Sequence, residues 1–290
     1  MLLSIGVEGK AQSPPASLRV LTYNIWNGFD WGKDSSRHQA CVQWIADQEA
    51  DVVALQELCG YDSIQLQADA AEWGHPYVAL LKTEGYPVGL TSRQPIKVIR
   101  RQLDGMWHGM LHAQSYGLDF YVVHLSPADV DFRWGEAQLI RNLIEQDAPA
   151  HYAILGDFNA HSPLDAERLE QNASLRQKYD RPPSKEGYSN LRLGEFDYSV
   201  ISTFLSLPTV DVVPRSVPIT ARFSFPAPTL VGPSQTAAAI RQNRQRIDYL
   251  LLSPALAKGS QGATIFNHGT PDSLSDHYPV MVEFQLPNRN

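Results

Sequence analysis

The order of apolar and polar positions near the start of the chain predicts alternating strands and a helix. Apolar residues run from Leu18 to Trp26 and again through 51–58, as they do in buried strands. Between these two runs, Val42, Ile45 and Ala46 recur at helical spacing within 37–48. A strand, a helix and a strand in this order are typical of an α/β protein.

The rest of the chain continues this mixed pattern. Closely spaced extended segments after the second helix suggest antiparallel pairing, whereas the Pro-, Ser-, Gln- and Arg-rich stretch 175–245 predicts long irregular loops. We interpret residues 18–286 as one mixed α/β domain that follows a flexible N-terminal segment, 1–17. The predicted elements are helices at 62–73 and 133–146, extended segments at 77–81, 88–92, 96–101, 107–114 and 118–125, and strands at 151–155, 247–252 and 279–284.

Composition and charge narrow the function without defining it. The chain has 290 residues, of which 43% are hydrophobic and 19% are charged, so it can bury a substantial core. The formal net charge of -7 gives no overall attraction to nucleic acid or to an anionic membrane. A tight DNA binder is therefore less expected. A nuclease is not excluded, because bound metal ions would invert the local charge of an acidic site.

Cysteine content and the N-terminus say little about the compartment. Cys41 and Cys59 are too few for a disulfide framework or a four-thiolate zinc site, so we expect buried free thiols. No apolar run approaches the ~18 residues of a membrane span. The start, MLLSIGVEGKAQS, lacks a basic region but resembles a signal-peptide remnant, so a secreted, a periplasmic and a cytoplasmic location all stay open. We expect a monomer.

Polar residues interrupt or follow several of the apolar runs. A polar residue at the end of a buried strand is costly unless it is paired or bound to metal, so this many of them predict one shared site. Singly, each has a structural explanation, such as a turn for Asn24, a salt bridge for Glu57 or a satisfied core histidine for His124. The full set is Asn24, Glu57, His124, Asp157, Asn159, Asp248, Asp276 and His277.

Two segments are more specific than the others. In GDFNAHS, Asp157 and Asn159 stand two positions apart after an apolar strand and would point into one cleft, with a simple turn as the alternative. In SDHYPV, Asp276 and His277 place a carboxylate beside an imidazole just before a strand, with an exposed turn as the alternative.

The ordered set of segments resembles a known superfamily. LTYNIWNG, VVALQEL, VVHLSP, GDFNAHS, RIDYLLLSP and SDHYPV resemble, over residues 18–285, the signature segments of the endonuclease/exonuclease/phosphatase superfamily. The resemblance implies a four-layered α/β sandwich, with two packed mixed β-sheets flanked by helices as in deoxyribonuclease I. Trp26 stands where abasic-site repair members carry an acid, and His124 where they carry Tyr. The chain is thus more similar to the deoxyribonuclease I and sphingomyelinase side.

The resemblance also implies roles for the eight polar residues. Asn24, Glu57 and Asp276 look like the metal site, while Asp157 and Asn159 look like the pair that orients the nucleophile, contacts the phosphate and can hold a second metal. His277 with Asp248 looks like the proton-handling pair, and His124 like a second imidazole whose carboxylate partner the sequence does not reveal.

These groups suit metal-assisted hydrolysis. Mg²⁺, and also Mn²⁺, takes oxygen ligands and commonly uses one or two carboxylates with substrate phosphate. Metal, amide and imidazole groups can stabilise a phosphoryl transition state without a covalent protein nucleophile. We therefore expect in-line attack by water, most simply in a phosphodiesterase or nuclease.

Other functions stay open from sequence alone. A phosphomonoesterase acting on sugar or inositol phosphates and a non-catalytic module that binds a phosphorylated ligand are the alternatives, and phospholipid headgroups are a further substrate class. A group of arginine and aromatic residues has two interpretations. It could form a surface that binds single-stranded nucleic acid, or the arginines could be solvated and the aromatic residues could belong to the core. The residues concerned are Arg241, Arg244, Arg246, Phe223, Phe225 and Trp107.

Overall fold

The computed structural model describes residues 17–180, 191–232 and 235–286. The predicted flexible N-terminal segment with its signal-peptide remnant therefore lies almost wholly outside the described residues, and so does 181–190 of the proline-rich stretch.

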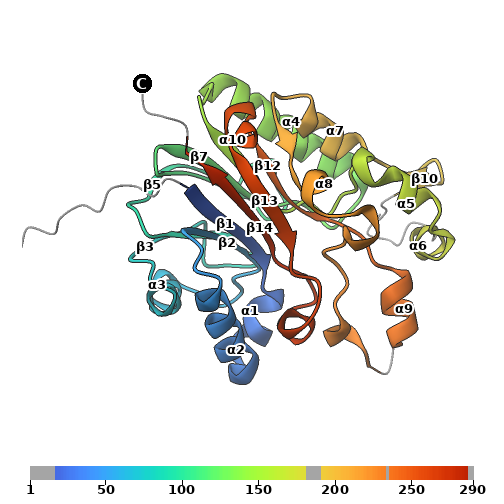
Figure 1. Ribbon diagram of the computed structural model, residues 1–290, viewed down its shortest axis with the longest axis horizontal. Coiled ribbons are helices and arrows are strands. Elements are labelled where there is room, and N and C mark those ends of the chain that lie inside the picture. Colours follow the sequence, from blue (N-terminus) through green and yellow to red (C-terminus); the bar gives the residue numbers. More distant parts are fainter. Residues whose placement is uncertain (1–16, 181–190, 233–234, 287–290) are drawn as a thin grey trace, which may run out of the picture.

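Two six-stranded mixed sheets pack face to face, as the resemblance predicted (Figure 1). The first sheet has the order β13-β14-β1-β2-β4-β3 and the second the order β11-β12-β8-β7-β6-β5. The strands of the first sheet are β1 (Ser17–Asn24), β2 (Val52–Gln56), β3 (Tyr77–Leu80), β4 (Gly89–Ser92), β13 (Ser260–Ile265) and β14 (Val280–Gln285). Those of the second are β5 (Lys97–Gln102), β6 (Met110–Ser115), β7 (Leu118–His124), β8 (Tyr152–Asp157), β11 (Val210–Asp211) and β12 (Asp248–Leu252).

Helices cover the outer face of each sheet and complete four layers (Figure 1). On the first sheet, α2 (Ser35–Asp47) and α3 (Ser63–Glu72) bury residues such as Ile45 and Leu66 against the strands. On the second, α4 (Val130–Asp147) and α7 (Ser199–Leu205) do the same with Ile140 and Phe204. No helix among the described residues is both long and apolar enough to cross a membrane.

The main core lies between the two sheets, where residues such as Val20, Val122 and Leu155 are fully buried. The remaining helices are short: α1 (Trp26–Gly32), α5 (Ala166–Glu170), α6 (Ala173–Tyr179), α8 (Val213–Ser216), α9 (Ala237–Gln242) and α10 (Pro254–Lys258). A two-stranded ribbon, β9 (Leu191–Arg192) with β10 (Glu195–Phe196), lies outside the two sheets.

Strand direction brings the polar residues to one end of the sandwich. β1 pairs with β2 in parallel, and β7 pairs with β8 in parallel, so the carboxyl ends of each pair lie together. β12 and β14 run antiparallel to β8 and β1, so their amino ends reach the same edge. The register places Asp248 directly opposite Asp157.

The sequence pattern located most strands but not their sheets. The extended segments of 77–125 do pair antiparallel, yet β3 and β4 belong to the first sheet whereas β5, β6 and β7 belong to the second. The prediction of irregular loops over 175–245 was wrong in part, because α7 buries Val200, Ile201 and Phe204. β13 was missed, because only Ala263 and Ile265 of its six residues are apolar and buried.

Candidate active site

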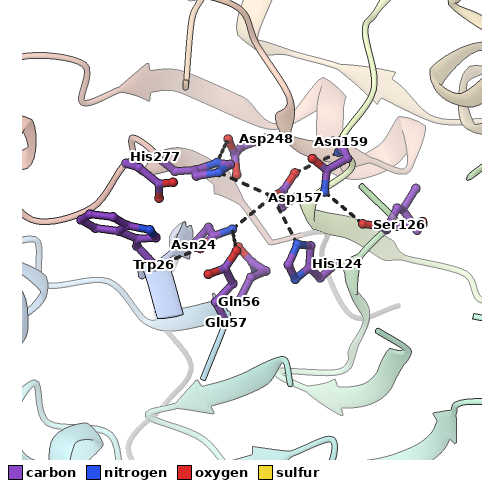
Figure 2. A network of polar contacts seen from close by, with 12 residues as sticks. Asn24, Trp26, Gln56, Glu57, His124, Ser126, Asp157, Asn159, Asp248 and His277 are labelled. Carbon is purple, nitrogen blue, oxygen red and sulfur yellow. Dashed lines mark hydrogen bonds and ion pairs between the residues drawn. The ribbon is translucent and has the colours of Figure 1, made fainter. Parts of the chain in front are cut away.

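Buried amide and carboxylate groups meet at the shared strand ends (Figure 2). The side-chain NH₂ of Asn24 donates to Glu57 Oε1 and to Asp157 Oδ2, each at 3.1 Å. Its amide oxygen accepts the backbone N–H of Trp26 at 3.0 Å. Asn24 therefore links the ends of the two sheets, and in this arrangement it presents donors, not an oxygen, to the acidic groups.

Two histidines converge on the carboxylate of Asp157 (Figure 2). Nε2 of His124 lies 3.5 Å and Nε2 of His277 3.7 Å from Asp157 Oδ2. Nδ1 of His277 is 2.9 Å from Asp248 Oδ2, as the sequence predicted for that pair. Asp157 is thus the carboxylate nearest His124, a partner that sequence reasoning did not find.

The surroundings favour opposite charge states for these two imidazoles. Burial, followed by the neighbouring His108 and His277, lowers the pKa of His124 well below its usual value. Burial also lowers the pKa of His277, but the carboxylates of Asp248, Asp157 and Asp276 together raise it well above the usual value. One uncharged and one protonated imidazole therefore face the same carboxylate.

Asn159 ties the site to the loop that follows β7. Its backbone N–H donates to Asp157 Oδ1 at 2.9 Å, and its side-chain NH₂ donates to the carbonyl oxygen of Leu125 at 3.0 Å. The pair predicted from GDFNAHS therefore lies in contact, with Asn159 held beside His124 in left-handed backbone geometry (φ 47°).

A left-handed turn fixes the entrance to the site from β1. Residues 26–31 all have φ between 52° and 60°, including the non-glycine residues Trp26, Asn27 and Phe29. Such a backbone costs each non-glycine residue roughly 1–2 kcal/mol and persists only where neighbours hold it. The turn aims the N–H of Asn27 at Glu57 Oε2, 2.6 Å away.

Arg37 of α2 braces this turn. Its guanidinium donates to the carbonyl oxygens of Ile25 (2.8 Å), Trp26 (2.9 Å) and Leu274 (3.0 Å), and it lies 4.9 Å from the ring centroid of Trp26. Sequence reasoning missed Arg37, because a helical arginine is usually solvated and nothing local marks one that is only 9% exposed.

Gly28→Ala should disrupt both the turn and the position of Glu57. A Cβ at Gly28 would lie 2.1 Å from the carbonyl oxygen of Cys59, so backbone must shift. We expect the free energy of unfolding to fall by about 2–4 kcal/mol, because the added methyl group strains and overpacks the backbone around it. Thermal or denaturant unfolding measures this. Gly32→Ala is the matched control, because Gly32 also has positive φ (79°) but an added Cβ there would meet open space. An equal loss of stability in both variants would contradict the packing argument.

A cavity of about 500 Å³ opens at this cluster. Six of the eight predicted residues line it, namely Glu57, His124, Asp157, Asn159, Asp276 and His277. Asn24 and Asp248 stand behind this lining and are 0% and 2% exposed. Sequence reasoning missed Tyr86 and His108 as lining residues, because they lie in loops with no motif of their own. It also missed Pro127, which ends the VVHLSP segment but has no polar side chain.

The arginine loop does not form the stacking surface considered from sequence. Arg246 is fully buried, with ion pairs of 2.7 Å to Asp165 and to Asp211, so it is neither solvated nor free for phosphate. Phe223 is a core residue on which Arg244 stacks. Trp107 and Phe225 line the cavity instead.

The donor set fits a divalent cation. Glu57, Asp157 and Asp276 line the cavity, and among the described residues no lysine or arginine lines it with them. Burial is the main cause that raises the pKa of Asp276 to about 6, with Glu57 contributing. Ligand atoms of Asp157, Asp248 and His277 also lie within 4.8 Å of one another, and Asp248 Oδ1 is buried without a partner among the described residues. Uncompensated oxygen ligands of this kind suit Mg²⁺ or Mn²⁺.

Comparisons with known proteins agree with the fold. The profile of the Endonuclease/Exonuclease/phosphatase family matches residues 21–277. A search of curated proteins gave no match. An AP endonuclease from Archaeoglobus fulgidus is similar in structure, with a TM-score of 0.66 and 18% identity over 93% of this chain and 100% of that one.

Two further solved structures are similar. A 3′-5′ exonuclease from Neisseria meningitidis has a TM-score of 0.64 and 18% identity, and covers 93% of this chain and 100% of its own. An endonuclease/exonuclease/phosphatase from Beutenbergia cavernae has a TM-score of 0.59 and 19% identity, over 94% of this chain and 72% of its own.

The profile match over nearly the whole chain assigns the class. This chain belongs to the endonuclease/exonuclease/phosphatase family, whose members are phosphoester hydrolases that generally use a divalent metal.

Proposed function

We propose that this protein is a divalent-metal-dependent phosphodiesterase that hydrolyses its substrate by in-line attack of water. The observation that carries the proposal is the convergence of His124 and His277 on Asp157, beside Glu57 and Asp276. A module that merely bound a phosphorylated ligand would not need the buried Asp248–His277 pair.

Each residue has a task that follows from its contacts. Glu57 and Asp276 would hold the cation, and Asn24 orients Glu57 through its NH₂ group. A cation bound there supplies electrostatic stabilisation of charge on the phosphate oxygens. This assignment keeps Asn24 in the metal site as a positioning residue, since its amide oxygen is engaged by the N–H of Trp26.

Proton handling falls to the other carboxylates and the imidazoles. Asp157 and Asn159 orient the attacking water and contact the phosphate. His277, held by Asp248, donates its Nε2 proton to the leaving oxygen as the bond from that oxygen to phosphorus breaks, and Asp157 accepts the proton that the attacking water loses. The uncharged His124 donates a hydrogen bond to a phosphate oxygen. No protein side chain forms a covalent bond to phosphorus in this scheme.

A panel of phosphoesters assayed with added Mg²⁺ or Mn²⁺ tests the proposal. The panel should contain phosphodiesters, nucleic acids, sugar phosphates and inositol phosphates. Turnover of a diester supports it, preferred turnover of monoesters favours the phosphomonoesterase alternative, and no turnover of any compound favours the non-catalytic module.

If duplex DNA is a substrate, its binding should depend only weakly on salt. The net charge is -7 and no lysine or arginine lines the described cavity, so few phosphates can be neutralised. The slope of log affinity against log salt is about -0.9 for each phosphate contact. A titration at several salt concentrations measures it, and a slope typical of ~6 or more contacts would contradict the expectation.

A further inference from the structure

Three residues form a ring-lined part of the cavity around His124, which we call the aromatic wall: Tyr86, Trp107 and His108. His108 stacks on His124 with ring centroids 4.2 Å apart and planes 21° apart. Tyr86 lies 5.2 Å and Trp107 6.4 Å from the His108 ring centroid. The Trp107 side chain is 45% exposed, so part of the wall is open to a ligand.

The aromatic wall offers contact surface without positive charge. Burial, followed by the charge of Lys82, lowers the pKa of His108 to about 3, so its imidazole is uncharged at neutral pH. Lys82 itself is not among the lining residues, and no lysine or arginine lines the described cavity. The cation site, His277 and His124 all serve the scissile phosphate, and no lysine or arginine in this lining is left to pair with a second anionic group.

The β5–β6 loop, which carries Trp107 and His108 of the aromatic wall, is anchored from α4. Glu136 is fully buried, and its two carboxylate oxygens accept the backbone N–H groups of Trp107 and Ser126, each at 2.8 Å. Arg133 donates to the carbonyl oxygens of Ser126, at 3.0 Å, and Ala128. One carboxylate thus fixes both the Trp107–His108 segment and the loop after His124, which makes this part of the wall a preformed surface.

We propose that the aromatic wall is the subsite for an uncharged, flat group attached to the scissile phosphate, with Glu136 as its positioning residue. The preferred substrate is then a singly charged phosphodiester that carries such a group next to phosphorus, not a molecule with several clustered phosphates. This inference rests on the proposed function for the position of the phosphate. Stacking on Trp107 supplies the selectivity.

Three phosphonates that differ in one group test the subsite by binding. Monomethyl phenylphosphonate and monomethyl methylphosphonate are both monoanions, whereas monomethyl carboxymethylphosphonate carries one additional charge on its carboxylate. Calorimetric titration of the whole chain with Mg²⁺ present should show the phenyl compound binding about tenfold more tightly than the methyl compound and the carboxymethyl compound binding no better. Equal binding of the phenyl and methyl compounds, tightest binding of the charged one, or no binding of any would overturn the proposal.

Variants with matched controls locate the effect. Trp107→Ala should reduce the phenyl preference to within about threefold, whereas Trp134→Ala should keep it, because Trp134 is 42% exposed but does not line the cavity. Glu136→Gln, which leaves one N–H without its acceptor, should also reduce the preference. Its control is Asp119→Asn, which should keep the phenyl preference. Asp119 is a buried carboxylate in β7 that accepts from His112 (2.7 Å) and Gln114 (2.9 Å).

These outcomes are separable from those of the proposed function. A phenyl preference that survives Trp107→Ala, or that falls equally in Asp119→Asn and Glu136→Gln, would overturn the assignment of the wall. Absence of turnover on the ester panel contradicts hydrolysis alone, and the binding preference still decides the subsite. Turnover without a phenyl preference leaves hydrolysis intact and overturns the subsite.

Discussion

Excess chelator should abolish phosphoester hydrolysis, and Glu57→Gln should raise the metal concentration for half-maximal activity by roughly 10–100-fold or more. Loss of an outer partner of a metal ligand already costs metal affinity in that range. Glu57 stands closer to the expected cation, and its oxygens are aimed by Asn24 at 3.1 Å and by the N–H of Asn27 at 2.6 Å. The amide keeps this shape but removes the negative charge. Activity measured against metal concentration, after stripping and readdition, gives the shift.

An acid outside the cavity provides the control for the Glu57 experiment. Glu72 is exposed at the end of α3 and does not line the cavity, so Glu72→Gln removes one charge without touching the site. Its metal requirement should stay that of the unmodified protein. Full activity in excess chelator after metal removal would contradict the metal assignment.

His277→Ala should lower kcat by roughly 10²–10⁴, the range for a positioned acid or base, without a comparable change in KM. Asp248→Asn should act in the same direction, because Asp248 Oδ2 holds His277 Nδ1 at 2.9 Å and fixes the orientation of the ring. In the double variant, the carboxylate has no imidazole left to orient, so the second change should cost little more. Single-turnover rates of the two single variants and the double variant measure the coupling.

The His38–Asp69 pair is the matched control for that cycle. Its Nε2 to Oδ2 distance is 2.8 Å, but neither residue lines the catalytic cavity. His38→Ala and Asp69→Asn should therefore leave the single-turnover rate near that of the unmodified protein. Independent, multiplicative losses at Asp248 and His277 would reject the two as one functional unit, and would instead favour a direct metal or phosphate contact for Asp248.

The sequence by itself determined most of the strands and the polar residues that we propose for the site. Burial imposes apolar runs on strands and helical spacing on helices. The sequence therefore reveals six of the strands, namely β1, β2, β7, β8, β12 and β14. A polar residue at the end of such a run is costly when unpaired, which singled out Asn24, Glu57, His124 and Asp157 before any geometry was known. The structure places all four in contact or in one cavity.

Only the tertiary structure decided what surrounds these residues. Arg37, Glu136 and Arg246 carry ordinary polar side chains, and their burial depends on partners far along the chain, such as Leu274 for Arg37 and Asp165 for Arg246. The left-handed turn after β1 persists because Arg37 and the β2–α3 loop enclose it, not because its residues prefer that backbone. Local propensity and periodicity carry no record of such long-range contacts. The brace and the aromatic wall became visible only in the packed fold, and the carboxylate that His124 faces only in the pairing of β7 with β8.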